Sequence, residues 1–221
     1  MYNEAIFAVT AAISFVASGL LVWLFAKSKA ISKLLWSLSF LILGLSTALI
    51  SIYGLKVLSI PLVAPLDSLI PGLLASGLVV SRRRMWGIYF LLYVSLMFCA
   101  LFALSLEFGA LAAPYVMLVH FPSGLVIFLL PIYLALTKKI AIEGLLVGIG
   151  GLLIGIAGLA LATLSTGFQI LPAAIVLEII APVFLTMTVL FTLGLLTTPT
   201  WGFPKHGQMK LPWGQANTAQ N

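Results

Sequence analysis

The chain has very few charged residues and almost no cysteine or histidine. Only 7% of its 221 residues are charged, and it holds one cysteine, Cys99, and two histidines. A soluble domain carries about 25% charged residues, so this chain has too few polar groups to cover a surface facing water. One cysteine excludes a disulfide framework within the chain, and two histidines are too few for the usual catalytic zinc. We therefore expect no metal, no cofactor and no enzymatic activity.

Long apolar runs take the place of the missing charge. Hydrophobic residues make up 62% of the chain, and a helix needs roughly 20 of them in a row to cross ~30 Å of hydrocarbon. Seven stretches meet this length, at about 5–26, 34–55, 58–80, 86–106, 112–137, 140–164 and 170–197. The predicted fold is an all-α integral membrane protein with seven transmembrane helices.

The basic residues fall almost entirely in alternate connections between these spans. Ten of the eleven Lys and Arg residues follow spans one, three, five or seven: Lys27, Lys29, Lys33, Arg82, Arg83, Arg84, Lys138, Lys139, Lys205 and Lys210. Only Lys56 falls on the opposite side. Because basic residues favour the cytoplasmic side, we expect the N-terminus outside and the C-terminus in the cytoplasm, at the plasma membrane. The net charge of +6 then indicates anchoring to the lipid bilayer, and no nucleic-acid partner is expected.

The chain also repeats itself at a distance of 111 residues. The segments "PLVAPLDSLIP" (Pro61–Pro71) and "PAAIVLEIIAP" (Pro172–Pro182) share both end prolines and a Leu followed by an acid. Shifting the sequence without a gap places spans one to three on spans five to seven, with eleven identities over residues 27–81. Five of these are Leu on Leu, which an apolar composition also produces by chance. The shift nevertheless respects every predicted boundary, and it predicts pseudo-symmetric, parallel 3+1+3 helical repeats.

This repeat divides the chain into four parts. We expect a first three-helix repeat at 1–81, a connector helix at 82–111, a second three-helix repeat at 112–197 and a cytoplasmic coil tail at 198–221. The tail is predicted as a coil because prolines, glycines and polar residues dominate it.

Span six carries a stripe of glycines. Its members recur at spacings of three and four residues, so they share one helix face: Gly144, Gly148, Gly151, Gly155 and Gly158. Small residues let helix backbones approach closely in lipid. The stripe therefore predicts helix packing and not a ligand site.

Three ionisable side chains lie well inside the predicted spans: Asp67 in span three, His120 in span five and Glu178 in span seven. In the expected topology each of these helices enters from the outside. At 1.5 Å per residue the three groups lie at a similar depth of roughly 10–14 Å. A charge there costs ~2.5–3.5 kcal/mol even on the lenient insertion scale. The three groups are therefore predicted to form a site for a proton, a cation or a solute.

Prolines concentrate in the same three spans, at Pro61, Pro65, Pro71, Pro114, Pro122, Pro131, Pro172 and Pro182. A proline inside a helix frees the carbonyl four residues earlier, so Pro71 frees that of Asp67 and Pro182 frees that of Glu178. An acid beside a bare carbonyl suits a proton or a small cation. Three further side chains are expected to support this site: Ser68, Tyr115 and Ser123. A purely structural role for the buried acids stays the alternative.

In architecture the predicted fold resembles two known groups, the small sugar transporters built from parallel triple-helix bundles and the microbial rhodopsins. The Pro-Gln motif of the first group is missing. In the second group a retinal-binding lysine follows the seventh-helix acid by four residues, and here that position is Pro182, in "VLEIIAPVF". We therefore assign the chain to neither family and expect no retinal.

The features above are compatible with three functions. The first is a small carrier, coupled to protons or cations, with its site between the two repeats. The second is a non-catalytic integral subunit of a larger membrane complex, for example a respiratory assembly, with other subunits contacting the C-terminal tail. The third is a chromophore-free seven-helix sensor, although the short loops carry no output domain.

Overall fold

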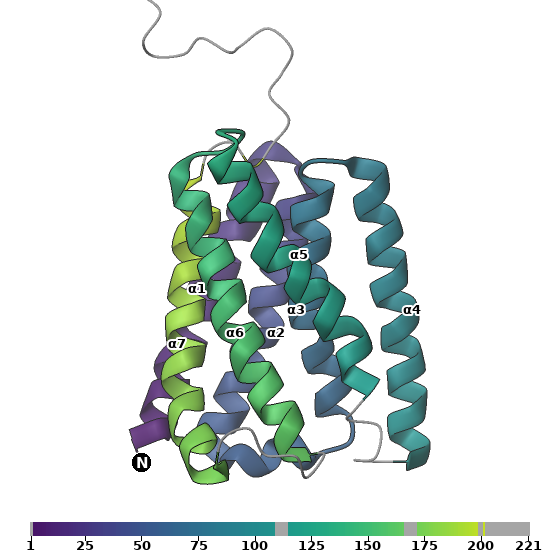
Figure 1. The fold of residues 1–221 in the computed structure, drawn as a ribbon, viewed down its shortest axis with the longest axis vertical. Coiled ribbons are helices and arrows are strands. Elements are labelled where there is room, and N and C mark those ends of the chain that lie inside the picture. Colours follow the sequence, from purple (N-terminus) through teal and green to yellow (C-terminus); the bar gives the residue numbers. More distant parts are fainter. Residues whose placement is uncertain (1, 109–114, 166–171, 199–200, 202–221) are drawn as a thin grey trace, which may run out of the picture.

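The computed structural model describes residues 2–108, 115–165, 172–198 and 201, and within these ranges it contains helices and connections but no strand. Figure 1 shows the helices side by side in one bundle. The α-helices are α1 (Tyr2–Ser28), α2 (Ile31–Tyr53), α3 (Val63–Val80), α4 (Arg84–Phe108), α5 (Met117–Leu136), α6 (Leu145–Ser165) and α7 (Ala173–Thr197), with short 3₁₀ helices η1 (Leu55–Ser59) and η3 (Ile142–Gly144).

Six of these helices are long and apolar enough to cross a bilayer: α1, α2, α3, α4, α5 and α7. In α6 the apolar stretch found within the described residues is shorter, at Ile142–Gly158. The long apolar helices identify an integral membrane protein, as the composition predicts.

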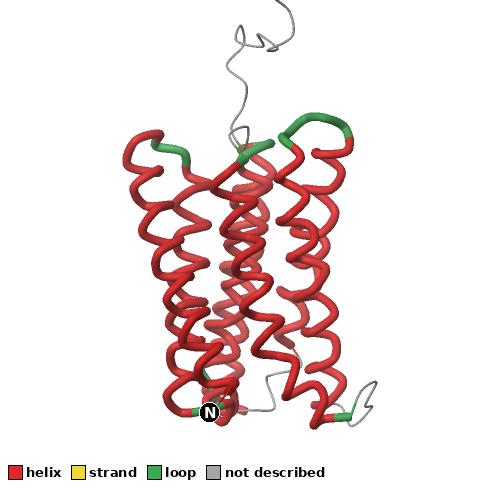
Figure 2. Tube along the Cα trace, turned by 90° about the vertical axis from the view of Figure 1, so that its left-hand side faces the viewer, coloured by secondary structure: helices red, strands yellow, loops and turns green. Residues whose placement is uncertain are grey.

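Helices that follow one another in the sequence run in opposite directions (Figure 1), and contacts between α1 and α2 show this for the first pair. Ser18 hydrogen bonds with Ser37, and the Ser51 hydroxyl donates to the carbonyl of Glu4. These pairs fit antiparallel α1 and α2. The connections after α1, α3 and α5 therefore lie at one end of the bundle, opposite the N-terminus (Figures 1 and 2). We call this the basic end, because these connections carry Lys29, Arg82, Arg83, Lys138 and Lys139.

Six helices form a closed ring, and α4 lies outside it. Contacts join α1 to α2, α2 to α3, α3 to α5, α5 to α6, α6 to α7 and α7 back to α1. Helix α4 packs on α3 and touches α5 only slightly, and it forms the outer edge of the bundle in Figure 1. Of the six long helices it buries the smallest share of its apolar surface.

Two apolar clusters fill the interior of the ring. The larger one lies toward the basic end and includes Trp36, Leu74 and Phe191 from α2, α3 and α7. The second joins Phe7 of α1 with Ile180 of α7 and with residues of α2, η1 and α6. Dispersion and tight packing, and not a solvent-driven hydrophobic effect, hold such helices together in lipid.

The start of α3 differs from the predicted helix boundary. The predicted span began at residue 58, whereas the helix begins at Val63. Gly54 ends α2 with φ of 72°, and the 3₁₀ helix Leu55–Ser59 follows. Pro61 has no N–H to continue a helical ladder across this segment. Lys56 therefore lies in a genuine connection and not at a kink within one helix.

The glycine stripe of α6 packs closely along only part of its length. A Cβ on Gly148 or Gly151 would come within 3.0 Å of backbone atoms of α5, and one on Gly144 would collide with Ile140. Around Gly155 and Gly158 no atom lies within 4 Å of the same position. Close approach of α5 and α6 thus depends on Gly148 and Gly151.

We expect Gly151→Ala to lower the free energy of unfolding by about 1–3 kcal/mol, the usual cost of overpacking. The added Cβ would lie 2.8 Å from Ile127 Cγ2 and 3.0 Å from the Phe128 backbone nitrogen. The matched control is Gly155→Ala, which should be neutral or stabilising by up to about 1 kcal/mol because alanine favours helix. Thermal unfolding in detergent measures both, and equal destabilisation by the two variants would contradict the packing described here.

Candidate functional site

Asp67 lies on the inward face of α3. It follows Val63 by one turn and precedes Ile70 by one turn, and these two residues pack against the two interior clusters. Its carboxylate Oδ1 accepts a hydrogen bond from the hydroxyl of Ser46 on α2. The structure therefore places one of the predicted acids between two apolar layers, with a single hydroxyl donor beside it.

The contact with Ser46 belongs to a row of polar contacts between α2 and α3. The Trp36 indole Nε1 donates to the carbonyl of Leu74 at 3.2 Å, and the Ser39 hydroxyl donates to that of Ile70 at 2.7 Å. Residues 36, 39 and 46 share one face of α2, because they are separated by three and seven positions. We call these three donors the α2 donor row. The α3 residues that accept these hydrogen bonds, Asp67, Ile70 and Leu74, lie on both sides of Pro71 in the sequence. Pro71 lies inside α3 and has no N–H to donate there.

Sequence reasoning missed the α2 donor row. Its signal is present in "WSLSFLILGLS", where Trp36, Ser39 and Ser46 stand on one side of a largely apolar helix. Such side chains in a membrane helix face a partner that accepts their hydrogen bonds. The pattern was detectable, but the partner helix was not.

Glu178 lies on the outside of the bundle. It is exposed, as are Leu177 and Ile179 on either side of it. The buried row of α7 includes Val176 and Ile180, and each of these is two residues from Glu178, or about 200° around the helix. The structure therefore does not bring Glu178 into the interior with Asp67, and the predicted pairing of the two carboxyls is not observed.

Under the predicted 111-residue shift, the residues on α2 and α6 that correspond to each other differ in polarity. This shift places Ser46 on Ala157 of α6, and the alanine side chain has no hydrogen-bond donor. Ala157 is buried and packs with Ile180 and Ala181 of α7. In the structure α7 turns apolar residues toward α6, and Glu178 is exposed.

His120 and Ser123 lie one turn apart on α5 and carry buried polar atoms. His120 Nδ1 and Ser123 Oγ have no hydrogen-bond partner among the residues that the structure describes. Buried polar atoms normally have a partner, so these two belong with the candidate polar residues of the interior. Within the described part of the chain, neither of them hydrogen bonds with the Asp67 carboxylate.

The hydroxyls of the other two predicted supporting residues form no hydrogen bond with the Asp67 carboxylate within the described part of the chain either. Ser68 is fully buried, and its hydroxyl donates to the carbonyl of Pro65 in its own helix at 2.6 Å. Tyr115 is 52% exposed and faces away from the interior. The candidate site on the described residues is therefore Asp67 with Ser46, and the roles of His120 and Ser123 stay predictions.

The site offers chemistry for one proton or one small cation. A carboxylate and a hydroxyl supply oxygen ligands, which hard cations prefer. Within the described part of the chain, no three His, Cys, Asp or Glu side chains gather closely enough to hold a metal ion.

No protein-family model, no curated protein and no solved structure matches this chain.

Proposed function

We propose that the chain is a small membrane carrier in which Asp67 takes up and releases a proton, or binds a small cation, during transport. The observation that supports this most is the position of Asp67 on the inward face of α3, where a hydroxyl on α2 contacts its carboxylate. An ionisable group inside a membrane protein is costly, at ~2.5–3.5 kcal/mol or more, and such groups commonly mark ion and substrate paths.

The surroundings of Asp67 give the proposal a mechanism. As a carboxylate, Asp67 accepts from Ser46 and holds α2 against α3. As a carboxylic acid it has a proton to donate, and Pro71 leaves the carbonyl of Asp67 without its usual helical donor. Gain or loss of the proton thus changes the contact between α2 and α3 beside a proline, where helices bend most easily. Bending of α3 at this point is the proposed opening step.

The proposal includes the expected repeat and topology. The ring contacts α1–α2, α2–α3 and α3–α5 correspond under the shift to α5–α6, α6–α7 and α7–α1, which are also present. This correspondence supports two equivalent three-helix halves with α4 as a connector. The basic end faces the cytoplasm in this proposal, with the protein in the plasma membrane.

Flux through purified protein in vesicles tests the carrier. Vesicles containing a pH-sensitive dye are given an imposed gradient of protons, sodium or potassium. We expect the protein to dissipate the proton gradient, alone or together with one of the two cations, faster than protein-free vesicles do. Equal rates with and without protein for all three ions would overturn the proposal.

A subunit of a larger membrane complex is the second candidate, and the position of Glu178 favours it. This carboxyl is exposed on the outer surface of α7, within an apolar helix. A charge that faces lipid is unfavourable, whereas a neighbouring chain with a donor or a basic group would stabilise it. Purification from native membranes in mild detergent should then recover stoichiometric partners, and Glu178→Leu should release them. A single monodisperse chain would count against this candidate.

A further inference from the structure

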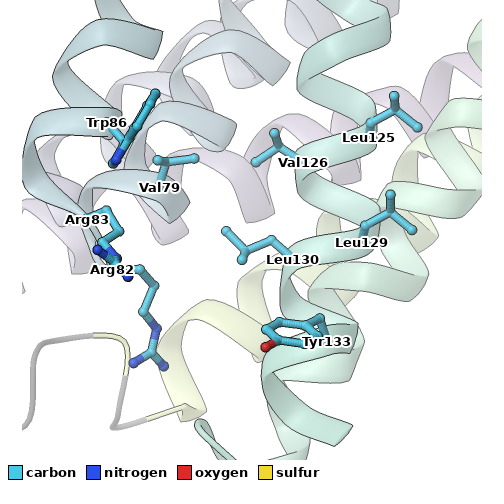
Figure 3. A pocket seen from close by; sticks show the side chains of 9 residues that line it. All are labelled: Val79, Arg82, Arg83, Trp86, Leu125, Val126, Leu129, Leu130 and Tyr133. Carbon is cyan, nitrogen blue, oxygen red and sulfur yellow. The ribbon is translucent and has the colours of Figure 1, made fainter. Parts of the chain in front are cut away.

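A cleft opens at the basic end between α4 and α5, over the end of α3. It has a volume of about 530 Å³, within the ~300–1,000 Å³ of small-molecule pockets. Figure 3 shows its two sides, with Val79, Arg82, Arg83 and Trp86 on one side and the α5 residues on the other. The cleft exists because α4 meets α5 near Leu118, where the Tyr93 hydroxyl donates to the Leu118 carbonyl, and not near the basic end.

The α5 side of the cleft is an apolar strip with a polar end. Leu125, Leu129 and Tyr133 follow one another at intervals of four residues, so they form one row along the helix. The row is about 12 Å long at 1.5 Å per residue. It begins at Tyr133, near the basic end, and runs toward the middle of the bilayer. An extended hydrocarbon chain fits such a strip.

Basic groups surround the polar end of the cleft. Arg82 donates through Nη2 to the carbonyl of Lys139 at 3.0 Å, which ties the α3–α4 connection to the α5–α6 connection. The Lys139 ammonium donates to the Tyr133 hydroxyl at 3.1 Å. Arg83 lines the same end and is exposed. Partial burial lowers the pKa of the Arg82 guanidinium, and an anion beside it would offset that desolvation.

We propose that this cleft binds an anionic phospholipid, with the phosphate at Arg82 and Arg83 and one acyl chain along the α5 strip. The positive charge at the polar end of the cleft favours an anion, because guanidinium groups bind phosphate through paired hydrogen bonds. The apolar wall and the lateral opening toward the bilayer select a lipid and not a soluble phosphate. Trp86 and Tyr133 are suited to the headgroup level, where aromatic residues gather. The proposal depends only on the membrane location of the chain and holds with or without transport activity.

Retention of lipid by the purified full-length protein tests this inference. The protein is equilibrated with an equimolar mixture of phosphatidylglycerol and phosphatidylcholine, and the bound lipid is counted by native mass spectrometry. We expect a preference for phosphatidylglycerol in the wild type. In the double variant Arg82→Gln with Arg83→Gln, the ratio of bound phosphatidylglycerol to bound phosphatidylcholine should fall at least about fivefold. A change of this size is what one basic group contributes near an anionic surface, about 1 kcal/mol.

Two further variants distinguish specific lipid binding in the cleft from nonspecific attraction of anionic lipid to the basic end. Lys27→Gln with Lys29→Gln removes the same charge from the last turn of α1 and the connection after it, and it should leave retention unchanged. Leu129→Trp keeps all charges, narrows the strip at an exposed position, and should weaken retention of phosphatidylglycerol. Excess soluble glycerol phosphate should not displace the lipid. Equal retention of both lipids by the wild type, full retention by the arginine variant, equal loss in the lysine variant, or displacement by glycerol phosphate would each overturn the inference.

Discussion

Asp67→Asn is expected to reduce proton-coupled flux in vesicles at least about tenfold, because an amide carries no proton to exchange at this position. The substitution keeps the size of the side chain, and its carbonyl oxygen still accepts from the Ser46 hydroxyl. The fold should therefore survive, and unchanged thermal unfolding in detergent would show this. The measurement is the initial rate of dye response after a pH step, normalised to the amount of inserted protein.

Two controls accompany this variant. Glu178→Gln removes a carboxyl that is exposed on α7, and it should leave the flux near the wild-type rate. Ser46→Ala removes the hydroxyl donor but keeps the carboxyl, and it should give an intermediate rate. A wild-type rate in Asp67→Asn would remove the basis of the carrier proposal. Loss of flux in Glu178→Gln alone would assign the coupling role to α7.

Trp36→Ala is expected to lower the free energy of unfolding by about 3–5 kcal/mol, the usual cost of deleting a buried aromatic side chain. Trp36 is 1% exposed. Its ring packs edge-on against Trp201 with centroids 5.8 Å apart, and its indole donates to the carbonyl of Leu74. The indole also lies directly against Gly77, where an added Cβ would collide with it, so the backbone of α3 packs closely on this ring.

Trp23→Ala provides the matched control for this substitution. Trp23 is 53% exposed, and its main contact is the Lys27 ammonium, 3.6 Å from the ring centroid. Loss of an exposed cation–π contact costs about 1 kcal/mol or less. Thermal unfolding of both variants in the same detergent measures the difference. Equal stability losses would show that Trp36 does not occupy the interior position described here.

The helical class and most element boundaries could be predicted from the sequence, because a membrane span needs a fixed length of apolar residues. The start of α3 could not, since the residues around Gly54 and Pro61 are as apolar as a helix interior. The left-handed φ that glycine permits at Gly54 and the missing N–H of Pro61, and not hydropathy, decide where α3 begins. The position of α4 outside the ring could not be predicted either, because the sequence of an apolar helix does not show how many helices pack against it.

The sequence predicts where the acids of the candidate site lie along their helices, but not which way they face. Counting residues places Asp67 within an apolar span, and α3 contains it four residues after Val63. Rotation around the helix depends on which face its neighbours need. The periodicity of α7 is weak because it is apolar all round, so its sequence did not show that Val176 and Ile180 face inward and Glu178 outward. That rotation depends on side chains of neighbouring helices, such as Ser46 beside α3 and Ala157 beside α7.

Infrared difference spectroscopy of the protein in lipid, recorded across a pH titration, tests most directly whether the interior carboxyl exchanges a proton. We expect a carboxylic-acid carbonyl band that appears on acidification, disappears in Asp67→Asn, shifts in Ser46→Ala and persists in Glu178→Gln. An unchanged titrating band in Asp67→Asn would contradict the central claim that the carboxyl on the inward face of α3 is the group that takes up and releases the proton.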